Sequence, residues 1–380
     1  MTAALYSAAV VVFSDMYVTQ PILPLLSHEF SIAPATAGLS VSLVVFMIAL
    51  ASTVYGPLSD LWGRKRVMVW SCALLALPTL LCAFAPSFGA LLLLRALQGI
   101  FIPGLTAVAV AYLGDQVEPD KLGRAVGGWI AANVAGGLSG RVISGVITDF
   151  FGWRTTFVSF AMLTLLAAVG LALALTPDLP AVSLTGRNSW QQAYRGMAGH
   201  LRNRRLVGVY LIGGSLFFGF IGIFTYLPYY LTAAPFRLSP ALVAFAYLSY
   251  LAGVIVSPLA GRLSARIARR SLIAVGILIA LCGMLLTLTP LLPVIVASLF
   301  VLCSGMFTAQ AVAPAFVNTV AQQAKGGAGA LYLMSYYLGG TLGALLPGYA
   351  WQAFGWPGVV GSCVAALLVA LLADWWLCGE

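Results

Sequence analysis

Long apolar segments, separated by short polar or Gly- and Pro-rich turns, run through almost the whole chain. A helix that crosses a bilayer needs about 20 mainly apolar residues. Twelve segments meet this requirement, at 4–26, 36–57, 67–86, 88–112, 125–148, 154–176, 206–232, 240–261, 271–289, 292–314, 327–350 and 356–378. They lack the alternation of apolar and polar residues that marks the strands of a membrane β-barrel. The pattern predicts an all-α membrane protein with twelve transmembrane helices.

The composition agrees with a membrane protein and excludes an ordinary soluble domain. Hydrophobic residues make up 61% of the 380 residues and charged residues only 8%, against about 25% in a typical globular domain. So few charges cannot cover a soluble surface, whereas lipid accepts apolar side chains on the outside of the protein. The first segment begins close to Met1 without a basic region and is too long for a signal-peptide core, so we expect a retained helix.

The net charge of +9 would suggest a nucleic-acid partner if the protein were soluble. The positive residues are instead sorted by loop. With the N-terminus inside, most Lys and Arg residues fall in inner loops, as in the cluster 64–66 and the basic run 202–205. This positive-inside distribution predicts a multi-pass protein of the inner membrane with both termini cytoplasmic. We therefore expect no nucleic-acid partner.

The two halves of the chain share a repeated pattern of glycines. Each residue of the second copy lies 203 positions after its counterpart, and the pairs are Gly136 and Gly339, Gly137 and Gly340, Gly140 and Gly343, Gly145 and Gly348, and the Phe-Gly-Trp tripeptides 151–153 and 354–356. Parallel repeats of six helices occur in secondary transporters, with the substrate held between them. We expect an N-terminal six-helix bundle at 1–176, a cytoplasmic linker at 177–205 and a C-terminal six-helix bundle at 206–380.

A charged loop joins the second and third segments, with the sequence Gly-Pro-Leu-Ser-Asp-Leu-Trp-Gly-Arg-Lys-Arg at 56–66. It resembles the signature loop of the major facilitator superfamily. The resemblance implies the twelve-helix major facilitator fold and a latch, made by Asp60, Gly63 and Arg64, that holds the inner gate shut in the outward-facing state. Gly63 permits the tight turn, and Arg64 can pair with Asp60. A generic positive-inside loop is the alternative interpretation.

Arg95 and Asp15 fall deep inside predicted helices. Arg95 belongs to the string Leu-Arg-Ala-Leu-Gln-Gly at 94–99, which resembles the Arg-x-x-Gln-Gly element of the same family. An ionisable side chain within the bilayer is costly, so it indicates a functional site with a partner. Asp15 in the first segment is the expected partner of Arg95. The two residues form either a proton-coupling site or a purely structural pair.

The fifth segment carries Asn133, followed by Gly-Gly-Leu-Ser-Gly-Arg at 136–141. This string resembles the Gly-rich element of drug/proton antiporters and is closest to the arabinose-efflux-permease-like group of exporters. In those families the element lies where helix five crosses helix eight. We therefore expect Gly136, Gly137 and Gly140 to pack against small residues such as Gly253. Arg141 is a second deep cation, with either a structural or gating role or contact with a polar substrate group.

Polar and aromatic residues inside the spans are candidates for lining a substrate cavity. They are Asn133, Tyr226, Gln310 and Tyr336. Such a lining suits moderately hydrophobic organic substrates better than inorganic ions. For Gln310 and Tyr336, packing within the helix bundle is an equally good interpretation.

Together these residues predict a secondary transporter that exports small organic molecules in exchange for protons by alternating access. Transport of a sugar or another metabolite, outward or inward, is the alternative within the same fold. The sequence has no P-loop, no metal-ligand spacing and no nucleophile with a base at one depth, so we expect no enzyme, cofactor or metal. A channel is disfavoured by the repeated halves and the latch. The expected partners are a small organic substrate, protons and the lipid bilayer, and the protein is expected to be a monomer.

Overall fold

The computed structural model describes residues 1–176, 199–321 and 325–378. The regular structure of these residues is helical. In chain order the elements are α1 (Thr2–Tyr17), η1 (Gln20–Ile22), α2 (Leu23–Glu29), α3 (Pro34–Trp62), α4 (Arg64–Cys82), α5 (Phe88–Phe101), α6 (Pro103–Thr106), α7 (Ala109–Gln116), α8 (Pro119–Phe151), α9 (Trp153–Ala174), α11 (Arg204–Thr232), α12 (Pro240–Phe245), η2 (Ala246–Tyr250), α13 (Leu251–Leu263), α14 (Arg269–Leu286), α15 (Leu292–Val320) and α16 (Lys325–Leu377). Most of the predicted linker, 177–205, lies outside the described residues, which resume at residue 199.

Eleven stretches of the described chain are long and apolar enough to cross a membrane. The last of them, Gly327–Leu377, has 51 residues, which is too long for a single span. It contains Gly355, whose φ of 61° and ψ of −145° are not helical, so it consists of two consecutive helices. The prediction of an all-α membrane protein with twelve transmembrane helices is confirmed.

The chain divides into two compact units. The first comprises Met1–Ser183 with Leu231–Leu248, and the second comprises Leu184–Tyr230 with Ser249–Glu380. The segment Leu231–Leu248 belongs to the first unit because α12 packs along α8 and against η1. The division of the chain into two bundles joined by a linker at 177–205 stays a prediction.

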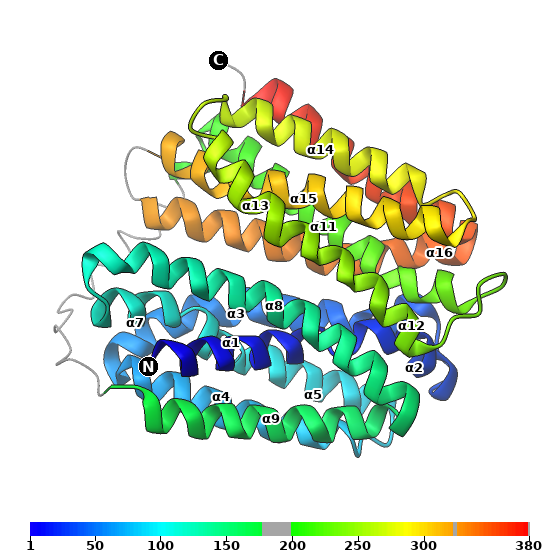
Figure 1. The fold of residues 1–380 in the computed structure, drawn as a ribbon, viewed down its shortest axis with the longest axis horizontal. Helices are drawn as coiled ribbons and strands as arrows, with labels where there is room; N and C mark the ends of the chain where they lie inside the picture. Colours follow the sequence, from blue (N-terminus) through cyan, green and yellow to red (C-terminus); the bar gives the residue numbers. More distant parts are fainter. Residues whose placement is uncertain (177–198, 322–324, 379–380) are drawn as a thin grey trace. The chain divides into compact units, whose positions relative to one another are not determined.

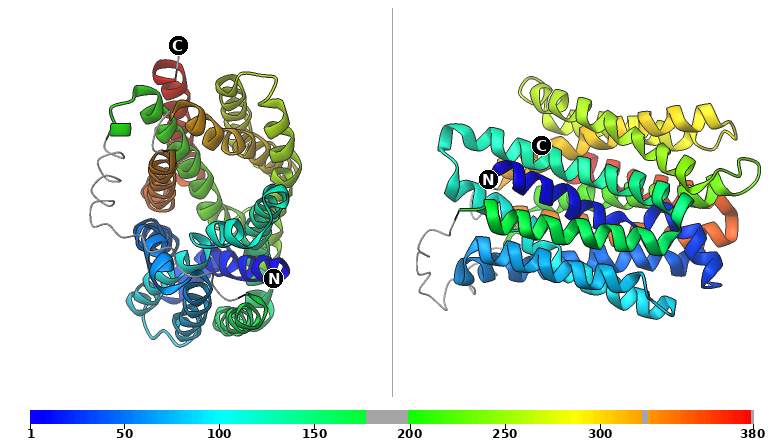
Figure 2. Two further views of the ribbon diagram at one scale, coloured as in Figure 1. Left: turned by 90° about the vertical axis from the view of Figure 1, so that its left-hand side faces the viewer. Right: turned by 60° about the horizontal axis from the view of Figure 1, so that its bottom comes forward.

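Within the first unit, α1 lies between α8 and α9 (Figure 1), and α4 runs beside α9 (Figure 2). Side chains tie the helix ends together. At the end of the unit that holds the N-terminus, the Lys65 ammonium donates to the Leu175 carbonyl oxygen at 2.6 Å. At the other end, the Trp153 indole N–H donates to the Glu29 carboxylate, and the Trp153 ring packs against Phe30.

Two glycines of α8 allow this helix to approach α1 closely. A Cβ atom at Gly136 would lie 2.5 Å from the Val10 carbonyl oxygen, and a Cβ atom at Gly140 would lie 2.4 Å from Cα of Ser14. The Ser14 hydroxyl also donates to the Gly136 carbonyl oxygen at 2.9 Å. The prediction that these two glycines face helix eight is therefore wrong, because the face they share is turned toward α1.

Another glycine of α8, Gly145, does face helix eight. A Cβ atom there would lie 2.3 Å from Cβ of Ala244 in α12. Gly145 follows Gly140 by five residues, about 140° around the helix, which turns it away from α1. Gly253, the expected small partner on helix eight, faces the ring of Phe307 instead, with 2.5 Å between its would-be Cβ atom and the ring.

The second unit repeats the close approach between α11 and α16. A Cβ atom at Gly339 would lie 1.9 Å from the Gly214 carbonyl oxygen, and one at Gly343 would lie 2.3 Å from the Phe218 carbonyl oxygen. Gly339 and Gly343 are the counterparts of the two α8 glycines that face α1. The repeated glycines thus join the same pair of helices, the first and fifth spans of each half.

The repeated Phe-Gly-Trp tripeptides mark two abrupt joins between helices. Gly152 has a φ of 83° between α8 and α9, and Gly355 has a φ of 61° inside α16. Glycine adopts a positive φ without the steric cost that a Cβ atom brings. Each glycine therefore lets one membrane span end and the next begin at once.

Candidate functional site

The first span is interrupted near its middle. α1 ends at Tyr17, and the chain continues through η1 into α2. The last carbonyl oxygens of a helix have no partner within that helix. The fully buried Arg95 supplies partners: its Nη1 donates to the Asp15 carbonyl oxygen at 3.0 Å and its Nη2 to the Met16 carbonyl oxygen at 2.7 Å. Its Nε donates to the Ser40 carbonyl oxygen at 3.0 Å, so the guanidinium joins α1 to α3.

The expected pairing of Arg95 with Asp15 needs a correction. Arg95 contacts Asp15 through the main-chain carbonyl oxygen, and none of the ion pairs between described residues joins the two side chains. The physical reason is the interruption of α1, which leaves carbonyl oxygens that the planar fork of donors can satisfy. A cation at the C-terminal end of a helix also interacts favourably with the helix dipole.

The Asp15 carboxylate is 0% exposed and faces two hydroxyl groups. Its Oδ2 lies 2.9 Å from Thr79 Oγ1 and 3.3 Å from Thr164 Oγ1. Its Oδ1 has no hydrogen-bond partner among the described residues. Gln98 Nε2 donates to Thr79 Oγ1 at 2.7 Å, and Arg95 Nη1 donates to Gln98 Oε1 at 2.5 Å. A continuous hydrogen-bonded chain therefore links the Asp15 carboxylate to Arg95.

Thr79 and Thr164 were not among the predicted site residues. They lie 64 and 149 positions from Asp15 along the chain. A threonine in an apolar span is uncharged and commonly bonds its own helix, so neither residue carries a signal of its own. Knowledge of which helices pack against α1 is needed to find them.

Arg141 is 1% exposed and makes polar contacts within the first unit. Its Nε donates to Gln20 Oε1 at 2.6 Å, and its Nη1 donates to the Gly137 carbonyl oxygen. The guanidinium lies 3.8 Å from the centre of the Tyr17 ring and 5.4 Å from that of Tyr247. Such contacts over aromatic faces stabilise a cation. The residue thus joins α8 to the interrupted part of the first span.

The predicted latch has an additional partner that the sequence did not indicate. Arg64 lies 3.6 Å from Asp60 and 2.7 Å from Asp115 in α7. Gly63 has a φ of 92° between α3 and α4, which explains the need for glycine at that turn. The shorter Asp115 contact ties this turn to the end of the fourth span. The gating role of the group stays a prediction.

The four cavity candidates lie in different surroundings. The Tyr226 hydroxyl, fully buried, donates to the Ala344 carbonyl oxygen at 2.7 Å. The Tyr336 ring stacks on Phe217 with 3.9 Å between ring centres. Gln310 has a buried Nε2 with no partner among the described residues. In the amide orientation that satisfies both of its polar atoms, Asn133 donates to the Trp129 carbonyl oxygen and accepts from Trp129 Nε1, each at 3.2 Å.

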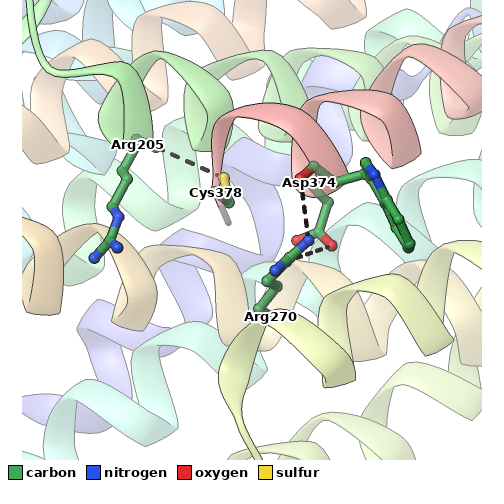
Figure 3. A network of polar contacts seen from close by, with 5 residues as sticks. Arg205, Arg270, Asp374 and Cys378 are labelled. Atoms are coloured by element: carbon green, nitrogen blue, oxygen red, sulfur yellow. Dashed lines mark hydrogen bonds and ion pairs between the residues drawn. The ribbon is translucent and has the colours of Figure 1, made fainter. Parts of the chain in front are cut away.

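Asp374, the acidic residue of the last span, pairs with an arginine of another helix. Figure 3 shows Arg270 at the start of α14 beside Asp374, with 3.3 Å between Nε and Oδ2. The Cys378 thiol, at the end of the same helix, donates to the Arg205 carbonyl oxygen at 3.7 Å. These contacts hold the ends of α11, α14 and α16 together. Asp374 is thus part of a structural cluster at one end of the second unit.

The described residues form a helical membrane protein with twelve spans, duplicated glycine contacts and buried charged side chains, which are features of polytopic membrane transporters. The sequence matches the family model of the Major Facilitator Superfamily over residues 5–325. The chain therefore belongs to the Major Facilitator Superfamily, whose members are transporters and not enzymes. The predicted superfamily and general class are confirmed.

Relatives match along the full chain. It is 36% identical over 372 residues to the inner membrane transport protein YnfM of Escherichia coli K12, covering 98% of this chain and 89% of that protein. It is 32% identical over 382 residues to the uncharacterized MFS-type transporter YybF of Bacillus subtilis 168, covering 100% of this chain and 92% of that protein. In fold it is similar to the crystal structure of a D-xylose-proton symporter, with a TM-score of 0.79 at 18% identity and coverage of 100% and 97%.

Proposed function

We propose that this transporter exports small organic molecules in exchange for protons, with Asp15 as the proton-binding group and Arg95 as the residue that organises its surroundings. The observation that carries the proposal is the Asp15 carboxylate, which is completely buried, bonded to neutral hydroxyl groups and free of an ion pair among the described residues. A buried carboxyl group without a counter-ion can exist in a neutral form, because ionisation in an apolar site is costly. Taking up and releasing a proton is therefore a chemical step available to it.

The direction of transport is proposed from the sequence. The Gly-rich string at 136–141 resembles that of drug/proton antiporters, closest to the arabinose-efflux-permease-like exporters. The name of the E. coli relative supports the inner membrane as the location. The positive-inside distribution supports cytoplasmic termini. The proposed partners are a small organic substrate, protons and lipid, and the proposed state is a monomer.

For the substrate site we propose Asn133, Tyr226, Gln310 and Tyr336. Among them Gln310 has the strongest physical support, because its buried Nε2 lacks a partner and a substrate acceptor would supply one. It stands three residues after Phe307 on α15, so both lie on one helix face. The Phe307 ring packs on the Phe220 ring, with 5.6 Å between the ring centres. A donor beside aromatic rings suits a planar organic molecule with a hydrogen-bond acceptor.

For the gate we propose that Asp60, Gly63 and Arg64 form a latch, and that Arg141 has a structural or gating role. The contacts of Arg141 with Gln20 and Tyr17 support this role, because they supply the partners that a buried cation needs. An anionic substrate group is therefore not required to stabilise it.

Transport in proteoliposomes with an internal pH-sensitive dye tests the proposed function. A panel of ethidium, benzoate and arabinose is added outside vesicles that hold an imposed pH gradient. For an antiporter, a transported compound moves protons in the opposite direction, and Asp15→Asn abolishes this movement while the protein still folds. Protons that move in the same direction as the compound would refute antiport, and proton-coupled transport in Asp15→Asn would refute the role of Asp15.

A further inference from the structure

The Thr79 hydroxyl has three polar neighbours within hydrogen-bond distance. Its Oγ1 lies 2.7 Å from Gln98 Nε2, 2.8 Å from the Leu75 carbonyl oxygen and 2.9 Å from Asp15 Oδ2. A hydroxyl group has one hydrogen to donate and two lone pairs that accept. Three partners use its full capacity, so the direction of each hydrogen bond can be worked out.

Arg95 determines the orientation of the Gln98 amide. A guanidinium only donates, so the atom of Gln98 that faces it at 2.5 Å is the oxygen Oε1. The amide nitrogen of Gln98 therefore faces Thr79 and donates to it. The Leu75 carbonyl oxygen only accepts, so it takes the single hydrogen of the hydroxyl. Toward Asp15, the Thr79 oxygen therefore has only a lone pair to offer. A lone pair accepts a hydrogen bond from a donor such as a protonated carboxyl group, and a carboxylate has no hydrogen to donate.

We propose that the structure holds Asp15 in its protonated form and that Thr79 is the positioning residue that responds to this proton. The inference rests on the proposed role of Asp15. With the proton present, the Oδ2–H group donates to Thr79, and Thr79 donates to Leu75. When the proton leaves Oδ2 for the aqueous phase, the carboxyl group becomes a carboxylate, and the Thr79 hydroxyl turns to donate to it. The Gln98 and Arg95 hydrogen bonds keep their directions in both states.

The other Asp15 oxygen agrees with the protonated form. Oδ1 is buried and has no partner among the described residues. Leaving an oxygen of an ionised carboxylate without a donor costs more than leaving the carbonyl oxygen of a neutral acid. Thr164 Oγ1, at 3.3 Å, donates to Oδ2 in either state.

Other charged or titratable groups also act on Asp15. The charged or titratable side chains that act electrostatically on Asp15 are Arg95, Cys72 and Cys82. Substitution of Thr79 leaves all of them in place. A changed response of Asp15 to pH in a Thr79 variant therefore reports the hydroxyl itself.

Infrared difference spectroscopy between two pH values, on the purified full chain in lipid nanodiscs, tests the proposal without a transport substrate. The carboxyl band that disappears in Asp15→Asn belongs to Asp15. In Thr79→Val this band is expected at higher frequency, because the carboxyl O–H loses its acceptor. The pH midpoint of the band is expected to rise by up to about one unit, because the hydrogen bond that the charged carboxylate loses is stronger than the one that the neutral acid loses. Thr79→Ser keeps the hydroxyl and is expected to behave as the wild type, and Thr79→Ala replaces Thr79→Val if the latter does not fold.

Thr164→Val serves as the matched control, because it removes a more distant hydroxyl from the same oxygen and leaves Thr79 in place. It is expected to shift the midpoint less than Thr79→Val does. An equal shift in both variants would contradict the proposal. An Asp15 band with the wild-type frequency and midpoint in Thr79→Val would overturn it and leave the proposed function standing. If no Asp15 band responds to pH in the wild type, both proposals fail.

Discussion

Gly140→Ala tests the close approach of α8 to α1. The added Cβ atom would lie 2.4 Å from Cα of Ser14 and 2.6 Å from its carbonyl oxygen. Both neighbours are main-chain atoms, so no side-chain rotation can relieve the contact and the helices must separate. Overpacking of this kind costs about 1–3 kcal/mol, and alanine regains about 0.5–1 kcal/mol of helix preference over glycine. We expect a net loss of up to about 2.5 kcal/mol of unfolding free energy against the wild type, and of about 1–3 kcal/mol against a glycine-to-alanine change elsewhere on α8 that meets no neighbour.

Gly127→Ala is the matched control, because Gly127 lies on the same helix and a Cβ atom there would meet no atom within 4 Å. We expect this variant to be as stable as the wild type or slightly more stable. Unfolding of both purified variants in mixed micelles, with increasing denaturing detergent, measures the difference. Equal stability of Gly140→Ala and Gly127→Ala would refute the packing of α8 on α1. The same comparison with Gly343→Ala examines the repeated contact with Phe218 in the second unit.

Three further substitutions address the charged residues. Asp115→Asn removes the closer partner of Arg64. Because a partly exposed ion pair is worth at most about 1 kcal/mol, we expect the inward-open population to rise by up to about fivefold. Unchanged accessibility of cysteines introduced at both ends of the protein would contradict the latch. In Arg95→Lys a single ammonium group cannot bond the three carbonyl oxygens that the guanidinium reaches, so we expect a lower melting temperature. An unchanged melting temperature would show that the planar set of guanidinium donors is not needed for stability. Arg141→Lys is expected to lower turnover with nearly unchanged substrate affinity, and a large loss of affinity confined to anionic substrates would place Arg141 in the binding site.

Much of the fold could be predicted from the sequence, because the bilayer imposes a simple rule. Each span must be a helix of about 20 apolar residues, so the number of spans follows from hydropathy alone. The break at Gly355 was predicted from the turn after residue 350, and the family from the loop at 56–66. The assignment of Leu231–Leu248 to the first unit depends on contacts between distant helices. Local sequence does not contain that information.

The candidate site was predictable in its charges and not in its contacts. Asp15 and Arg95 stand out because ionisable residues are rare inside membrane spans. The interruption after Tyr17, which turns Arg95 toward carbonyl oxygens, was not predicted. Thr79 was missed because a neutral hydroxyl becomes informative only when its neighbours are known. The family resemblance predicted that Gly140 packs against helix eight, whereas the structure places it against Ser14 of α1.

The two halves share their glycine contacts and differ in where they carry charge. In the first half, Asp15, Arg95 and Arg141 lie well inside the spans and are almost completely buried. In the spans of the second half, charged residues stand only near helix ends, as Arg270 and Asp374 do. A duplicated fold needs the glycines in both copies, because each copy must bring its first and fifth spans together. A buried carboxylate such as that of Asp15 has no such structural necessity, and an ionisable group is costly in lipid. Asp374 in the second half is also buried but stands near a helix end and pairs with Arg270. A carboxyl group deep within a span and without an ion pair occurs, among the described residues, in the first half, so under the proposed mechanism proton binding is a property of that half.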